Sequence, residues 1–220
     1  MAKIPLVYPK IPNSEACLLN NCIAFEKYDG TNLHFVWKRN HGWIGFGTRR
    51  DRFSNNNKGI KQFNAAHPEL TGVLNVLRNK TDLELFSYDH PSYKSCNDII
   101  VFMEYHGPNS FAGQHDPKDI KRLTLIDVMT DGTEIIPPQQ FLDDFMAHGV
   151  ERFDIAKVIY KGKYSGQFSE DVRNGKYPVN EGVVCKGIID NKVYMCKIKT
   201  NAYMNKLQTQ FKDNWKDYWE

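Results

Sequence analysis

The sequence lacks a CxxC pair and any long apolar run, and each absence argues against a class of protein. Its five cysteines include no CxxC pair, and an odd number argues against a closed disulfide framework, so we expect reduced thiols. No run of eighteen apolar residues occurs, and the chain does not begin with a basic segment followed by an apolar one. We therefore expect no membrane span and no export, which favours the cytoplasm.

The sequence also lacks the spacings that mark two common kinds of catalytic site. Its seven histidines include no HxxxH or HExxH pattern, so zinc is not expected. Ser110 lies in GPNSFAG, which is not the small-residue elbow of a serine hydrolase. A hydrolase is therefore not indicated.

A strong net charge is missing as well. The chain of 220 residues carries a formal charge of +3, so its bulk charge does not dictate its partners. Only a local cluster, Arg49 to Arg52, offers a basic patch for phosphates. With 41% hydrophobic and 13% aromatic residues, the chain can bury one substantial core or two small ones.

What is present is a succession of short strand-like segments with helical segments between them. Because strands and helices do not alternate regularly, the pattern predicts a mixed, largely antiparallel α+β fold with flanking helices and not a Rossmann sheet. With no linker or repeat, we expect a single domain over residues 1–220. Apolar and β-branched runs predict strands over 33–38, 43–47, 99–105, 123–129, 134–136, 153–160, 182–185 and 193–198, and apolar spacing predicts helices over 68–79, after Pro137-Pro138, over 165–174 and over 202–219.

The most informative segment is Lys27-Tyr28-Asp29-Gly30-Thr31-Asn32, which directly follows the apolar run 23–25. A lysine amine attacks phosphorus only when it is neutral, so a catalytic Lys27 requires a pKa below the usual ~10.4. Lys197 and Lys199, in the sequence KIK, could lower that pKa by like-charge repulsion if the fold brings them close. Read alone, the first segment is equally compatible with a turn after a strand, and KIK with an exposed strand face.

Four further motifs follow along the chain: Thr48-Arg49-Arg50 and VFMEYHGP over 101–108 each end an apolar run, and EGVVCK over 181–186 and MCKIK over 195–199 come later. With KYDG, these motifs resemble in kind and order those of the covalent nucleotidyltransferases, which are DNA ligases, RNA ligases and mRNA-capping guanylyltransferases. Glu26 before Lys27, the GTN after KYDG and FMEYHGP are most similar to the RNA ligase 2 branch, which includes phage and RNA-editing ligases. The resemblance covers about residues 20 to 205.

The resemblance implies the nucleotide cleft of that superfamily and a reaction in which Lys27 attacks the α-phosphorus of ATP to give lysyl-N-AMP. It implies that Lys197 and Lys199 stabilise phosphate charge and that Glu181 acts on a catalytic Mg²⁺ or Mn²⁺ ion. Asp29 is expected to orient Lys27 or, equally, to cap the turn that Gly30 completes. The expected nucleotide-binding residues are Glu26, Asp29, Gly30, Asn32, Arg49 with Arg50 as a competing candidate, Glu104 at the ribose, Leu123, Glu181, Lys197 and Lys199.

Two features depart from that family. Where relatives carry an aromatic residue that stacks on adenine, this chain has aliphatic Leu123 in RLTLIDV, which would bury the base without reading its edge. The chain also stops about twenty residues after Lys199, where relatives often carry a further domain that holds nucleic-acid ends. We therefore expect no separate OB or C-terminal ligase domain. Either the terminal helix and a basic surface suffice, or an accessory protein helps, or self-adenylylation outstrips sealing.

The resemblance implies an ATP-dependent RNA ligase that joins 3′-OH and 5′-phosphate ends of RNA. One alternative is a DNA ligase or a capping guanylyltransferase with the same lysine chemistry. The other is a nucleotide- or RNA-binding module without turnover, against which the set Lys27, Glu181, Lys197 and Lys199 argues.

Overall fold

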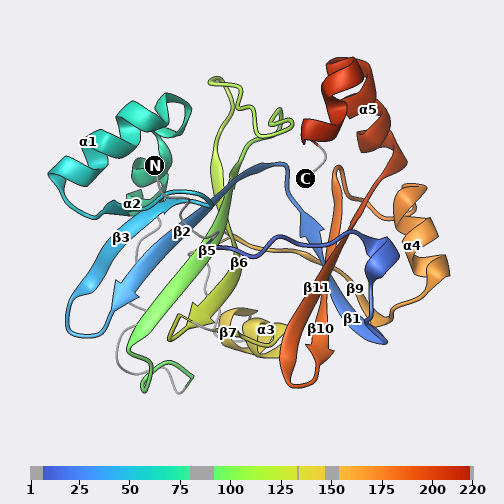
Figure 1. The fold of residues 1–220 in the computed structure, drawn as a ribbon, viewed down its shortest axis with the longest axis horizontal. Helices are drawn as coiled ribbons and strands as arrows, with labels where there is room; N and C mark the ends of the chain where they lie inside the picture. The colour runs from blue at the N-terminus through green and yellow to red at the C-terminus, as the bar shows by residue number, and fades with distance from the viewer. Residues whose placement is uncertain (1–6, 80–91, 133, 147–153, 219–220) are drawn as a thin grey trace.

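The computed structural model describes residues 7–79, 92–132, 134–146 and 154–218, and its strands form two sheets that lie side by side (Figure 1). Nearly all neighbouring strands are antiparallel, and helices lie around the sheets. The predicted mixed, largely antiparallel α+β fold is therefore confirmed. No helix of the described ranges is both long and apolar enough to cross a bilayer.

The larger sheet has the strand order β4-β3-β2-β5-β6-β7, and β8 pairs in parallel with β6. Alternate residues of its strands, such as Phe35, Val101 and Leu125, face one apolar core. The predicted hairpin over 33–38 and 43–47 is confirmed, as are the strands over 99–105 and 123–129. The strands are β2 (Gly30–Lys38), β3 (Gly42–Thr48), β4 (Phe53–Ser54), β5 (Asp98–His106), β6 (Arg122–Thr130), β7 (Glu134–Ile135) and β8 (Asp154–Ile155).

The smaller sheet has the order β11-β10-β1-β9 and is antiparallel throughout. Val183, Cys185 and Ile198 belong to a second apolar core beneath it. Its strands are β1 (Asn21–Lys27), β9 (Val158–Lys163), β10 (Gly182–Ile189) and β11 (Lys192–Lys199), so the predicted hairpin of 182–185 with 193–198 is confirmed and is longer than expected.

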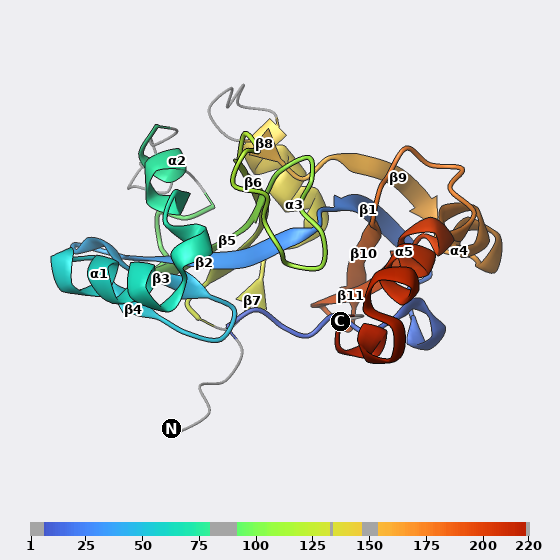
Figure 2. The same cartoon turned by 90° about the horizontal axis from the view of Figure 1, so that it is seen from above.

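The link between the two sheets runs through Lys27. β1 ends at Lys27 in the smaller sheet, and after only two residues Gly30 begins β2 in the larger one (Figure 2). A Cβ atom on Gly30 would lie 2.3 Å from the Tyr105 carbonyl oxygen, so only glycine fits this close approach. The short link holds Lys27 at the boundary between the sheets.

Five α-helices flank the sheets within the described residues, and one of them was not anticipated. Helix α1 (Asn57–Ala66) buries only Gly59 and Phe63, so it has little apolar periodicity in the sequence; the Asn56 side chain caps it by accepting from the Gly59 amide. The helix predicted over 68–79 is wrong in its first part, because Pro68–Leu70 forms a 3₁₀ turn before α2 begins. The others are α2 (Val73–Asn79), α3 (Pro138–Met146), α4 (Gly166–Arg173) and α5 (Asn201–Phe211).

Two further expectations need correction. The strand predicted over 153–160 divides, because β8 belongs to the larger sheet and β9 to the smaller one, with Ala156 and Lys157 carrying the chain across. The helix predicted over 202–219 ends at Phe211, because Lys212 has a φ of 47° and a 3₁₀ helix follows over Lys212–Tyr218. Residues 153 and 219 lie outside the described ranges.

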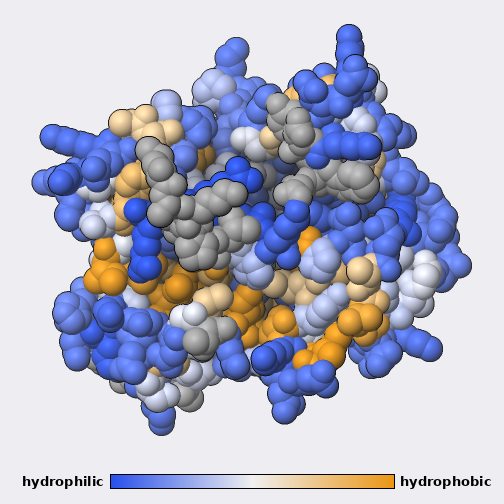
Figure 3. Space-filling model, in the orientation of Figure 1, coloured by the Kyte–Doolittle hydropathy of each residue, from blue (hydrophilic) through white to orange (hydrophobic). Residues whose placement is uncertain are grey.

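The face of the molecule shown in Figure 1 is hydrophilic over most of its outline (Figure 3). Hydrophobic side chains gather in the lower half of this face, where the lower ends of strands from both sheets lie.

Candidate active site

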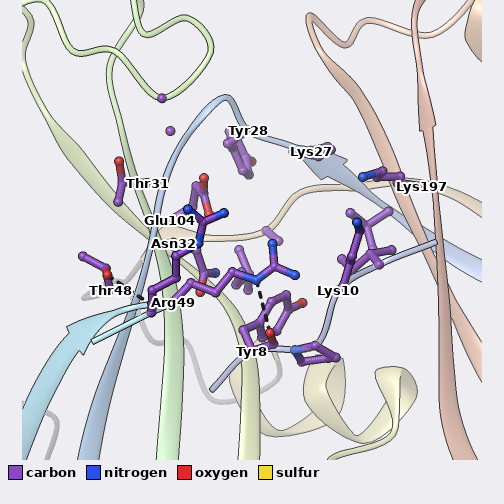
Figure 4. A pocket seen from close by; sticks show the side chains of 18 of the residues that line it. Tyr8, Lys10, Lys27, Tyr28, Thr31, Asn32, Thr48, Arg49, Glu104 and Lys197 are labelled. Atoms are coloured by element: carbon purple, nitrogen blue, oxygen red, sulfur yellow. Dashed lines mark hydrogen bonds between the residues drawn. The ribbon is translucent and has the colours of Figure 1, made fainter. Parts of the chain in front are cut away.

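A cavity of about 570 Å³ lies between the two sheets, and residues from both sheets line it (Figure 4). Lys27 and Lys197 reach it from the smaller sheet, while Asn32 and Glu104 reach it from the larger one. Residues 8–11 of the N-terminal segment, 7–17, form part of the wall. A cavity with several charged groups on opposite walls suits a charged, partly apolar ligand.

Lys27 lies in a cluster with Glu181 and Lys199 that the strand register explains. Lys27 is opposite Gly182 in the β1–β10 pair, and Gly182 is opposite Lys199 in the β10–β11 pair. The Lys27 ammonium donates to Glu181 at 2.9 Å, and the Lys199 ammonium lies 3.0 Å from the same carboxylate. Glu181 is buried, and its carboxylate is paired with both cations.

A glycine allows Glu181 to enter this cluster. A Cβ atom on Gly182 would lie 2.0 Å from the Ile198 carbonyl oxygen. Any other residue would push the start of β10 away from β11. The Thr200 amide also donates to the Glu181 carbonyl at 2.9 Å, which fixes the residue beside the end of β11.

A lowered pKa was expected for Lys27, and this expectation is wrong for this structure. Burial lowers the pKa of Lys27, but the nearby carboxylates of Glu181 and Glu104, the hydrogen bond to Glu181 and Asp29 raise it more, so the net shift is upward. Like-charge repulsion acts instead on Lys197. Burial, together with the charges of Lys199 and Lys27, lowers the pKa of Lys197 to about 8. Burial also lowers the pKa of Lys199.

The two lysines of KIK occupy different places. Lys197 lines the cavity and can meet a ligand directly (Figure 4). Lys199 is not among the lining residues; it lies behind Glu181, with its ammonium 5.0 Å from the centre of the Tyr203 ring. Lys199 is therefore placed to position Glu181.

On the larger sheet, Asn32 and Glu104 are opposite each other in the β2–β5 pair and both line the cavity. Burial raises the pKa of Glu104 to about 8, although Lys27 and a hydrogen bond with Asn32 oppose the shift. Arg49 and Arg50 lie at the end of β3, and both line the cavity; the Arg49 Nε donates to the Tyr8 carbonyl at 3.2 Å. Both arginines thus remain candidates for ligand contact.

Glu26, Asp29 and Gly30 surround Lys27 in the sequence but take different places. Glu26 and Gly30 line the cavity, whereas Asp29 is not among the lining residues. The Asp29 carboxylate accepts from the Ala112 amide at 2.9 Å and hydrogen-bonds with the Tyr203 hydroxyl. Of the two expected roles, the geometry favours a structural one, in which Asp29 joins the loop after β5 to helix α5.

Leu123 does not occupy the place expected for it. Its side chain is 1% exposed in the core of the larger sheet and does not line the cavity, because residues of one strand face opposite sides in turn. Three residues further along β6, Ile126 lines the cavity. Ile126, with Ile11, Leu70 and Val184, is therefore among the aliphatic side chains that a base could contact in the cavity.

Sequence reasoning missed a polar group beneath the cavity. Lys186, which lines the cavity, donates to Asp127 at 2.6 Å and to the Ile126 carbonyl at 2.7 Å. The Tyr8 hydroxyl donates to the same Asp127 carboxylate. The motif EGVVCK contains Lys186. Because Lys186 is two residues after Val184, both side chains lie on the same face of the strand, and this spacing could have indicated that Lys186 faces the cavity. Nothing in the sequence marks Tyr8.

The described residues contain no group of three or more histidine, cysteine or acidic side chains arranged to hold a metal ion. A Mg²⁺ or Mn²⁺ ion that shares phosphate oxygens needs only one or two carboxylates. Glu104, which lines the cavity, offers one. Glu181, beside Lys27, is buried, is not among the lining residues and is paired with Lys27 and Lys199, so it becomes the second ligand when a cation takes the place of one of these lysines. The donor set therefore fits a cation that arrives with phosphates.

Comparison with known proteins places the fold. No family model matches the sequence, and no curated protein matches it. Solved structures do match: a ligand-free variant of Naegleria gruberi RNA ligase (TM-score 0.64, 14% identity, 94% of this chain and 60% of that chain) and another variant of that ligase with AMP and manganese (0.62, 14%, 93% and 59%). An archaeal ATP-dependent RNA ligase also matches (0.56, 15%, 93% and 51%). The chain spans about 60% or less of the length of these proteins, and shares their mixed α+β fold.

Proposed function

We propose that residues 1–220 act as the nucleotidyltransferase domain of an ATP-dependent RNA ligase, with Lys27 as the nucleophile. The observation that carries the proposal is the cluster of Lys27, Glu181 and Lys199 at the edge of a cavity that also presents Lys197. In it, a lysine, a carboxylate and two further cations from three adjacent strands converge where a nucleotide would fit. The fold shared with solved RNA ligases supports the same conclusion.

In the proposed first step, the Lys27 Nζ attacks the α-phosphorus of ATP, and the bond to pyrophosphate breaks. Negative charge grows on the α-phosphate oxygens and on the leaving group. Lys197, which lines the cavity, stabilises that charge, and Arg49 or Arg50 contributes from the opposite wall. Lys199 keeps Glu181 in place beside Lys27.

Lys27 must lose a proton before it can attack, and its present ion pair with Glu181 retains that proton. A divalent cation bound at Glu181 would offset both this carboxylate and the phosphate charge. Glu181 therefore has two proposed tasks in sequence, which are to orient the Lys27 ammonium and to hold the cation. Glu104 and Asn32 would contact the sugar, and Ile126 would pack on the base.

In the later steps, AMP passes from Lys27 to the 5′-phosphate of an RNA end, and the 3′-OH of a second end displaces AMP. RNA is favoured over DNA because the solved proteins named above that share the fold are RNA ligases. An accessory protein remains a proposed partner.

The test uses α-labelled ATP and GTP, followed by nicked and single-stranded RNA and DNA. We expect labelling of the protein from ATP and sealing of RNA ends. We also expect the Lys27→Ala protein to seal pre-adenylylated RNA while failing with ATP and 5′-phosphate RNA, because the joining of pre-adenylylated ends does not use the amine. Labelling from GTP alone would point to a capping enzyme, sealing of DNA alone to a DNA ligase, and ATP binding without label to a binding module.

A further inference from the structure

Four of the five cysteines lie together in the smaller sheet, and the proposed reaction uses none of them. Cys22, Cys185 and Cys196 are on β1, β10 and β11, and Cys185 is directly opposite Cys196 in the strand register. Cys17 ends the N-terminal segment, residues 7–17, and its Sγ lies 2.6 Å from the Sγ of Cys196. All four belong to the core of the smaller sheet, while Cys96 belongs to the core of the larger one.

The N-terminal segment holds Cys17 in this position through contacts along β11. The Lys197 amide donates to the Pro12 carbonyl at 2.9 Å, and the Tyr194 hydroxyl donates to the Ala16 carbonyl at 2.8 Å. The same segment supplies residues 8–11 to the cavity wall. Cys17 and Cys196 thus lie where the N-terminal wall of the cavity meets the strand that carries Lys197.

Access differs within the cluster. Cys17 is partly exposed, whereas Cys185 and Cys196 are both 0% exposed. Hydrogen bonding with Cys185, and further with Cys17 and Tyr164, lowers the pKa of Cys196 to about 7 against the effect of burial. An oxidant from solvent therefore meets Cys17 first. Burial and the hydrogen bond with Cys196 raise the pKa of the Cys17 thiol to about 12, so Cys17 must pass its proton to the neighbouring Cys196 thiolate before it attacks.

We propose that Cys17 and Cys196 are an oxidisable pair that closes to a disulfide and fastens the N-terminal wall of the cavity to the strand of Lys197. With a peroxide as oxidant, the Cys17 sulfur attacks a peroxide oxygen, the O–O bond breaks, and a sulfenic acid and one water form. The Cys196 sulfur then attacks the Cys17 sulfur, and the S–O bond breaks to release a second water. Two thiols lose two hydrogens in all, and one peroxide is reduced to two waters.

The bond would join residues 179 apart in the chain, so it would restrict the unfolded chain strongly. From the entropy of closing so long a loop, the melting temperature should rise by roughly 10 °C. This inference does not depend on Lys27 chemistry, and its test does not measure ligation.

The experiment treats the intact protein with a small excess of hydrogen peroxide, blocks the remaining thiols and maps the non-reduced peptides by mass spectrometry. We expect a Cys17–Cys196 cross-linked peptide, a higher melting temperature, and reversal of both by dithiothreitol. The Cys96→Ser protein should behave like wild type, and the Cys17→Ser protein should show neither change. Melting curves under reducing conditions show whether each variant is folded.

Three outcomes would overturn the proposal. They are the absence of a cross-linked peptide in wild type, a dominant Cys185–Cys196 peptide, and a rise in melting temperature that persists in the Cys17→Ser protein.

Discussion

The charged side chains around Lys27 shift one another's pKa values. Three cations, Lys27, Lys197 and Lys199, meet the carboxylates of Glu181 and Glu104. Because the pKa of Lys27 is raised and that of Lys197 is lowered to about 8, the two lysines respond to pH in different ranges. Lys197 is a cation in the cavity that loses its charge as pH rises through about 8.

Nucleotide affinity should therefore fall as pH rises through about 8. Below that pH Lys197 is charged and attracts phosphate, and above it the charge is lost. Glu104 acts in the same direction, because its pKa is about 8 and it becomes negative in the same range. The measurement is a titration of ATP binding without divalent metal at a series of pH values.

Two variants separate the two groups. Lys197→Arg keeps its positive charge at high pH and should leave only the smaller pH dependence that is due to Glu104. Glu104→Gln should leave only the part due to Lys197. A wild-type affinity that is constant from pH 7 to 9 would show that neither group titrates against the nucleotide.

The positions of Ile126 and Leu123 lead to opposite expectations for the same substitution. Ile126→Phe should tighten ATP binding by about 0.5–1.5 kcal/mol, because an aromatic ring at the cavity wall can stack on the base. Leu123→Phe should instead destabilise the protein by about 1–3 kcal/mol through overpacking, with little gain in affinity. Calorimetric binding and denaturant unfolding of both proteins check this, and a reversed result would return the base to Leu123.

At the scale of the elements, most strands of the described residues were predictable. Apolar and β-branched residues gather within the sequence of each strand, so the pattern can be recognised without knowing its partners. Helix α1 was not predictable, since Gly59 and Phe63 are its buried residues. The division of residues 153–160 between the two sheets was not predictable either. That division depends on which strand each half meets, and a local pattern does not contain this information. The N-terminal segment was missed for the same reason, because Tyr8 acquires its role from Asp127, far away in the chain.

The loop after β5 and helix α5 should depend on Asp29. In the Asp29→Ala protein the Ala112 and Gly113 amides and the Tyr203 hydroxyl lose their acceptor. We expect a loss of about 1–3 kcal/mol in the free energy of unfolding and faster amide exchange over residues 107–116. Asp116 offers a control in the same loop, because its carboxylate accepts a local bond from the Lys118 amide.

The Asp116→Ala protein should differ from wild type by much less than the Asp29→Ala protein. Equal effects of the two substitutions would show that Asp29 is an ordinary turn residue and does not join the loop to α5.

At the scale of the whole molecule, the site is a product of long-range pairing. The motifs that contain Lys27, Glu104, Glu181 and Lys197 could be selected from the sequence, because each places a polar group next to an apolar run. Their meeting around one cavity could not, since β1 pairs with β10 across most of the chain. The shift of the base contact from Leu123 to Ile126, and the placing of Lys199 behind Glu181, likewise required the strand register.

The most direct test of the account is whether ATP labels Lys27 covalently. The protein is incubated with ATP and Mg²⁺ or Mn²⁺, digested, and sequenced by tandem mass spectrometry, with Lys27→Arg and EDTA-treated protein as controls. The account predicts an AMP adduct on the peptide that contains Lys27, and no adduct in either control, because arginine cannot become a neutral amine and the phosphate charge would lack its cation. An adduct on another lysine, or full labelling of the Lys27→Arg protein, would contradict the account.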